Sequence, residues 1–142
     1  MSDADASPSE TPSILIVEDH LETRLLYRCL LQPDYRLSLT SDPAEARATL
    51  AGASTSEDGA CPFDLVILDI NLGTDVQGVD LLHRLRREAL PEQVPAVAIT
   101  AHALPGDADR LLANGFDAYL RKPFTRTELL DTLASVRPAA RA

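Results

Sequence analysis

The sequence has no tryptophan, and aromatic residues make up only 4% of its 142 residues. A core for one domain must therefore be built mainly from Leu, Val, Ile and Ala, and the 45% share of hydrophobic residues is large enough for it. Only two cysteines occur, Cys29 and Cys61, and their spacing matches neither a metal motif nor a redox motif, so we expect ordinary reduced thiols. No apolar run reaches membrane-span length, and the N-terminus lacks a basic flank followed by an apolar stretch. We therefore expect a soluble, cytoplasmic protein that does not bind membranes.

Positive charge is also scarce, because 22 acidic residues outnumber 13 basic ones and leave a net charge of −9. Nucleic-acid binding rests on Lys and Arg that neutralise phosphates, so this balance argues against a direct nucleic-acid partner. It also disfavours anionic membrane surfaces, although many acidic proteins carry such charge only for solubility. The basic residues include a single lysine, Lys122.

Changes in composition along the chain indicate one domain between two tails. Residues 1–12 are mostly Ser, Asp, Ala and Pro and predict a disordered tail, followed by a domain at 13–137 and a short tail at 138–142. Within the domain, apolar runs and helical patterns alternate five times. The runs predict strands at residues 14–17, 35–40, 63–68, 96–99 and 118–120, and the helical patterns cover 20–31, a stretch after Asp42, 78–89, 106–113 and a stretch after Thr125.

The type of strand predicts the fold class. The first, third and fourth runs are continuously apolar, which is typical of central strands in a parallel sheet covered on both faces. Five such βα units predict a three-layer α/β sandwich, with a five-stranded parallel sheet of order 2-1-3-4-5 and five helices, as in flavodoxin-like folds. In the first helix, Leu21, Leu25 and Cys29 fall on one stripe, with Leu26 and Leu30 beside it.

Two helix starts carry capping signals. Asp42 and Pro43 precede Glu45, and Thr125 precedes Glu128 by three residues, which is the spacing of a capping box. The stretch 52–60 is expected to be a surface loop without an assigned function.

Polar residues directly follow the central strands. Glu18 and Asp19 follow the first, Asp69 the third and Thr100 the fourth. The carboxyl ends of parallel strands share one edge, and ligands bind there where neighbouring connections leave toward opposite faces. Three carboxylates brought together repel one another, and Mg²⁺ relieves this because it binds one or two carboxylates, water and a phosphate oxygen. Any one of these residues alone is more often a helix cap, and His20 is expected only to start the first helix.

The lone Lys122 adds a positive charge to the same edge. Its compact ammonium on a flexible stem suits contact with a phosphoryl oxygen, whereas the alternative is a lysine retained on the surface by chance. Pro123 follows it directly, which raises the possibility of a cis peptide bond that fixes the direction of Lys122.

Four segments in this order, ILIVEDH, LVILDINL, VAITAH and YLRKPF, resemble the motifs of the CheY-like receiver domain of response regulators in two-component signalling. The resemblance runs from about residue 13 to 136. It implies that Asp69 is the phospho-acceptor, that Glu18, Asp19 and Asp69 bind Mg²⁺ with the backbone carbonyl of Asn71, and that Thr100 and Lys122 contact the phosphoryl oxygens. It also implies that Tyr119 is an aromatic switch residue. The loop at 72–78 departs from the family pattern, because it lacks the usual proline and has one extra residue.

The resemblance implies a stand-alone response regulator rather than a turnover enzyme. It would take a phosphoryl group from a sensor histidine kinase or phosphotransfer protein, catalyse only its own phosphotransfer and dephosphorylation, and signal to a downstream protein target, with a homodimer as an open option. Only six residues follow Val136, so we expect no output domain. Two alternatives remain: a receiver-like adaptor that is never phosphorylated, and an aspartyl-phosphate phosphatase. The phosphatase is disfavoured because its nucleophile lies in an Asp-x-Asp pattern after the first strand, where this chain has Glu18, Asp19 and His20.

Overall fold

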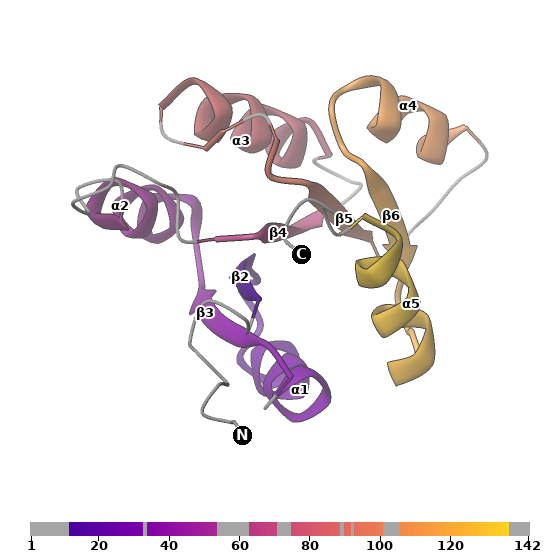
Figure 1. The fold of residues 1–142 in the computed structure, drawn as a ribbon. Coiled ribbons are helices and arrows are strands. Elements are labelled where there is room, and N and C mark those ends of the chain that lie inside the picture. The colour runs from indigo at the N-terminus through magenta and orange to yellow at the C-terminus, as the bar shows by residue number, and fades with distance from the viewer. Residues whose placement is uncertain are drawn as a thin grey trace.

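The computed structural model describes residues 12–32, 34–53, 63–70, 75–88, 90–91, 93–100 and 106–136. Outside these ranges lie both expected tails except residue 12, as well as Cys61, Asn71, residues 54–60 of the loop expected at 52–60 and residues 72–74 of the loop at 72–78. In chain order the elements are β2 (Ser13–Val17), α1 (Leu21–Leu31), β3 (Arg36–Thr40), α2 (Pro43–Ala53), β4 (Leu65–Ile70), α3 (Asp75–Glu88), β5 (Ala96–Thr100), α4 (Asp107–Ala113), β6 (Ala118–Arg121) and α5 (Arg126–Val136). They alternate as the sequence predicts (Figure 1).

The sheet has five parallel strands in the order β3-β2-β4-β5-β6, which confirms the predicted 2-1-3-4-5 topology. Strand β2 pairs with β3 on one side and β4 on the other, so the first and third strands along the chain are neighbours. The β4 strand begins and ends two residues later than predicted, and at its end Asp69 and Ile70 continue the pairing with β5 opposite Ile99 and Thr100. Asp69 is therefore part of the strand rather than the residue after it.

Helices cover both faces of the sheet. Figure 1 shows α2, α3 and α4 on one side and α1 and α5 on the other. Alternate residues of β4 divide between the two layers: Val66 and Leu68 pack with α2, α3 and α4, whereas Leu65 and Ile67 pack with α1 and α5. Because side chains of a strand alternate between faces, a continuously apolar strand supplies both cores at once.

The first helix packs through a different stripe from the one read in the sequence. Tyr27 and Leu31 are its buried residues. Leu21, Leu25 and Leu26 are 59%, 46% and 44% exposed, and Cys29 is exposed as well. Apolar residues occur on most sides of α1, so periodicity alone does not identify the stripe that faces the sheet. Tyr27 and Leu31 lie four residues apart and therefore on one side of the helix, but only the docked helix shows that this side is the buried one.

The starts of α2 and α5 agree with their capping signals, whereas α3 starts at a different residue from the one predicted. Glu45 N–H donates to Asp42 Oδ1 at 2.8 Å, while Glu45 Oε1 accepts from Ser41 N–H at 2.7 Å. Helix α3 begins at Asp75, three residues earlier than predicted. Among the described helices, none is long and apolar enough to cross a membrane.

Candidate functional site

The polar residues at the strand ends meet at one edge of the sheet. Glu18 follows β2, Asp69 is the second-last residue of β4, Thr100 ends β5 and Lys122 follows β6. Backbone hydrogen bonds beyond the strands hold two of them in place: Glu18 N–H donates to Thr40 O at 2.9 Å, and Lys122 N–H donates to Thr100 O at 2.7 Å. The register of the sheet therefore fixes the spacing between these side chains.

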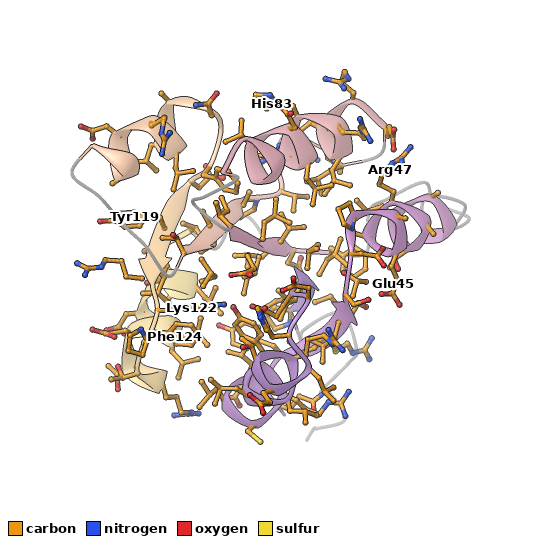
Figure 2. The ribbon with its side chains drawn as sticks, turned by 180° about the vertical axis from the view of Figure 1, so that it is seen from behind. Glu45, Arg47, His83, Tyr119, Lys122 and Phe124 are labelled. Carbon is orange, nitrogen blue, oxygen red and sulfur yellow. The ribbon has the colours of Figure 1, made fainter. Side chains whose placement is uncertain are left out.

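Lys122 joins the buried carboxylate of Glu18 and the largely buried one of Asp69. Its Nζ lies 2.9 Å from Asp69 Oδ1 and 3.1 Å from Glu18 Oε1. The Glu18 side chain is fully buried and that of Asp69 is 16% exposed, whereas Lys122 is 22% exposed. Figure 2 shows Lys122 extending from the end of β6 toward the middle of the molecule. The peptide bond between Lys122 and Pro123 is cis, as the sequence suggested.

Burial and the contact between Lys122 and Asp69 act in opposite directions on the pKa values of both residues. Burial raises the pKa of Asp69 above its usual value; the hydrogen bond from Lys122 opposes that rise, and the charge of Glu18 adds to it. For Lys122, burial alone would lower the pKa, but the hydrogen bond and charge of Asp69 together with the charge of Glu18 outweigh it, so the pKa is raised. The site therefore keeps its lysine protonated and holds one carboxylate whose negative charge is costly.

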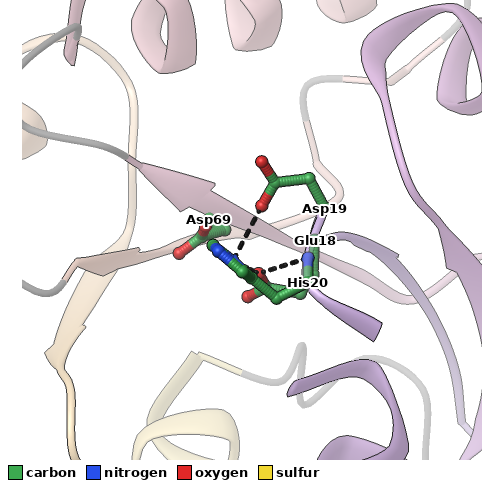
Figure 3. Close-up of side chains that lie close together, drawn as sticks. All are labelled: Glu18, Asp19, His20 and Asp69. Atoms are coloured by element: carbon green, nitrogen blue, oxygen red, sulfur yellow. Dashed lines mark hydrogen bonds and ion pairs between the residues drawn. The ribbon is translucent and has the colours of Figure 1, made fainter. Parts of the chain in front are cut away.

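Asp19 and His20 complete the cluster on its exposed side. One ligand atom from each of Glu18, Asp19, His20 and Asp69 lies within 4.8 Å of all the others. The His20 Nδ1 atom is 3.0 Å from Asp19 Oδ1 and 3.2 Å from Glu18 Oε2 (Figure 3). Carboxylate oxygens are the ligands that Mg²⁺ prefers, and a divalent cation would offset their mutual repulsion. The donor set therefore fits a divalent cation.

Three residues near the site were not identified as functional from the sequence. His20 was expected only to start α1; its position directly after Glu18 and Asp19 was the available signal. Arg24 Nη1 donates to Glu18 O at 2.8 Å and so holds the backbone that carries the acidic pair. The Tyr27 hydroxyl is buried without a hydrogen-bond partner among the described residues, and burial, followed by the charges of Glu18 and Asp69, raises its pKa. No sequence pattern distinguishes this tyrosine from a core aromatic residue.

The expected switch residues lie on neighbouring strands. Thr100 is buried at the end of β5. Tyr119 on β6 pairs with Ala98, which lies two residues before Thr100 on β5. Tyr119 is half-buried and packs at the edge of the core on the α2, α3 and α4 side (Figure 2). The backbone carbonyl of Asn71 falls outside the described residues, so its position relative to the cluster is not described.

Sequence comparison places these features among known proteins. Residues 14–134 match the family described as the response regulator receiver domain. Over 126 residues the chain is 30% identical to the polar-differentiation response regulator DivK of Brucella ovis, covering 88% of this chain and 95% of DivK. It is also 35% identical over 82 residues to the signal transduction histidine-protein kinase BarA of Escherichia coli, covering 56% of this chain but only 8% of BarA. The chain thus matches DivK along nearly its full length and BarA in one small part.

Solved structures share the same fold. The chemotaxis protein CheY4 of Vibrio cholerae superposes with a TM-score of 0.71 at 27% sequence identity, covering 89% of this chain and 98% of that one. A response regulator from Thermotoga maritima gives a TM-score of 0.72 at 20% identity, covering 89% and 97% of the two chains. The second likeness, at its lower identity, concerns the fold alone.

Proposed function

The chain belongs to the response regulator receiver domain family, and on that premise we propose that it accepts a phosphoryl group on Asp69 and signals through the resulting change in its protein-binding surface. Receiver domains of the DivK and CheY type are signalling phospho-acceptors rather than classical enzymes. The observation that carries the proposal is the contact of the only lysine, Lys122, with both Asp69 and Glu18 at the carboxyl edge of the sheet. A structural role alone would not require an ammonium at 2.9 Å from a strand-borne aspartate that is already costly to ionise.

The proposed reaction transfers phosphorus from nitrogen to oxygen. An Asp69 carboxylate oxygen attacks the phosphorus of a phosphohistidine on a sensor kinase or phosphotransfer protein; the new O–P bond forms as the P–N bond breaks, and the histidine leaves with the electron pair of that bond. The protein contributes position and charge rather than further covalent chemistry. Lys122 neutralises charge on the phosphoryl oxygens, and the Thr100 hydroxyl is proposed as a second contact to them.

The acidic cluster supplies the metal site that this chemistry requires. Glu18, Asp19 and Asp69 are the residues proposed to hold Mg²⁺, together with the backbone carbonyl of Asn71, which lies outside the described residues. When bound, Mg²⁺ neutralises the charge that builds up on the phosphoryl group. The clustering of three carboxylates supports this part of the proposal, since two of them are largely buried and only one lysine offsets their charge.

The proposed output is a shift between two surface states. A phosphoryl group on Asp69 attracts the Thr100 hydroxyl, and the resulting movement opens space that the Tyr119 ring fills. The half-buried position of Tyr119, beside β5 and at the edge of the core, supports this role. A downstream protein, or a second copy of the chain, would read the changed surface, and we propose a cytoplasmic location with the receiver domain at residues 13–137.

The test is covalent labelling of the full chain with acetyl phosphate and Mg²⁺. Intact-mass analysis of wild type should show one added phosphoryl group that mild base removes, and Asp69→Asn should show none. Asp131→Asn, which alters an exposed aspartate on α5, is the matched control and should label like wild type. Labelling of Asp69→Asn to the wild-type level would refute the acceptor assignment. No labelling of any protein, with acetyl phosphate or with a phosphorylated histidine kinase, would favour the adaptor alternative.

A further inference from the structure

His20 occupies a position that neither helix capping nor core packing explains. It is the N-cap residue of α1, yet its side chain makes no capping hydrogen bond. The ring instead turns toward Asp19 and Glu18, and its side chain is 71% exposed (Figure 3). Within the part of the chain that the structure describes, one bond ties its backbone to the cluster, from His20 N–H to Glu18 Oε2 at 3.2 Å. The imidazole is thus free to adjust without disturbing the core.

The spacing of the ring from its neighbours fits two ligands on one cation, and it is also that of a hydrogen bond between them. Ligands held at right angles about 2.1 Å from an octahedral ion lie about 3 Å apart. His20 Nδ1 lies 3.0 Å from Asp19 Oδ1 and 3.2 Å from Glu18 Oε2, and all four ligand atoms fall within 4.8 Å of one another. The phosphoryl chemistry proposed above needs only oxygen ligands. The nitrogen of His20 is therefore an additional donor at that site.

We propose that His20 determines the metal selectivity of this site, adding a nitrogen ligand that favours first-row transition-metal dications over Mg²⁺. The inference rests on the proposed function only in taking the cluster to be a cation site. Mg²⁺ prefers oxygen ligands and gives up its water reluctantly, so an imidazole adds little to its binding. Imidazole suits Ni²⁺, Zn²⁺, Cu²⁺ and Fe²⁺, so a site of three carboxylates and one histidine gains affinity for these ions selectively.

A competing account makes His20 a hydrogen-bond partner that only screens the carboxylates in the absence of metal. The two accounts differ in sign. If the ring screens, its removal frees the carboxylates and strengthens the binding of every dication alike. If the ring is a ligand, its removal weakens Ni²⁺ and leaves Mg²⁺ nearly unchanged.

The experiment is isothermal titration of the untagged full chain with Mg²⁺ and with Ni²⁺, comparing wild type with His20→Asn. Asparagine keeps a polar side chain of similar reach but lacks the imidazole. The matched control is His83→Asn, which removes an exposed histidine on α3 whose Nε2 lies 2.9 Å from Asn114 O, outside the cluster. The exposed Cys29 thiol is present in all three proteins, so metal bound there cannot produce a difference between them.

The ratio of Ni²⁺ to Mg²⁺ affinity should fall by at least about tenfold in His20→Asn, with the Mg²⁺ affinity changed less than about threefold. His83→Asn should keep the wild-type ratio. An unchanged ratio in His20→Asn, or a parallel rise in the affinity for both ions, would overturn the role of His20. Mg²⁺ binding and phosphoryl labelling of wild type test the proposed function separately, since both should persist when the selectivity claim fails.

Discussion

Individual residues at the site carry opposing electrostatic effects, and Asp69 is the clearest case. Burial and the charge of Glu18 raise its pKa, and the Lys122 ammonium only partly offsets them. The folded chain therefore binds the Asp69 proton more tightly than the unfolded chain does. The free energy of unfolding therefore falls as pH rises from 3.8, the ordinary pKa of an aspartate, through the raised pKa of Asp69 in the folded chain. It does not recover at neutral pH.

Substitution of Asp69 by Asn should accordingly stabilise the metal-free protein. At neutral pH the free energy of unfolding should rise by roughly 1 kcal/mol or less, since the site is partly screened and Lys122 retains Glu18 as a partner. The gain should shrink as pH falls through the folded pKa of Asp69 and vanish below 3.8, where wild type is protonated in both states. Urea denaturation of wild type and Asp69→Asn at a series of pH values, without divalent cations, measures this difference in the free energy of unfolding. A gain that is equal at acidic and neutral pH would contradict it, and the exposed Asp131→Asn variant should show no such pH-dependent gain.

Helix α5 shows at the scale of an element how a local sequence signal translates into stability. Its capping box is reciprocal: Glu128 N–H donates to Thr125 Oγ1 at 3.0 Å, and Thr125 N–H donates to Glu128 Oε1 at 3.0 Å. Both backbone donors lie at the helix start, where no intrahelical partner is available. The box stabilises the helix that follows the segment carrying Lys122.

Loss of this cap should weaken the fold measurably. Thr125→Ala should lower the free energy of unfolding by about 1 kcal/mol, the usual cost of removing an N-cap oxygen. Thr127→Ala, a change at another exposed threonine two residues later, should alter the free energy of unfolding by less than about 0.5 kcal/mol because it removes no cap. Chemical denaturation of both variants gives the comparison. Equal losses in the two would mean that side-chain propensity, and not the cap, sets the stability of this helix start.

The elements differ in how far the sequence could predict them. The central strands were predictable because residues buried on both faces must be apolar without interruption, and the capping box because Thr125 and Glu128 act within one helical turn. The packing stripe of α1 was not, since Leu21 and Leu25 are as apolar as Leu31 and only docking against the sheet distinguishes them. The end of β4 was misplaced by two residues for a similar reason. An aspartate normally ends a strand, but pairing with β5 carries Asp69 along.

At the scale of the whole molecule, the site depends on the sheet topology. Asp19 and Asp69 become neighbours only because β2 and β4 are adjacent, and the order of the strands is what the alternating pattern predicts. The sequence could therefore predict the acidic residues and Lys122 as a group. It could not predict that His20 turns its ring into the cluster, or that the charges of Glu18 and Asp69 act on the buried Tyr27 hydroxyl, because both depend on how α1 leaves the sheet and docks.

The topology also links global stability to the proposed cation site, since its residues come from β4 and from the segment directly after β2. A ligand that binds only the native state stabilises it by about 2.7 kcal/mol at a hundred times its dissociation constant. The chain carries a net charge of −9, however, so any salt also reduces its self-repulsion. Specific binding must therefore be separated from screening.

Mg²⁺ should raise the midpoint of thermal unfolding in a saturable way, beyond the effect of NaCl at equal ionic strength. Asp19→Asn should abolish the saturable part, because it removes a carboxylate of the cluster whose side chain is 71% exposed and therefore contributes little to the core. Asp131→Asn changes the net charge equally but leaves the cluster intact, so it should retain the wild-type response. Differential scanning calorimetry across a Mg²⁺ series distinguishes these outcomes. If the rise in midpoint is the same in all three proteins, Mg²⁺ acts by screening the acidic surface, and the cluster does not hold the ion.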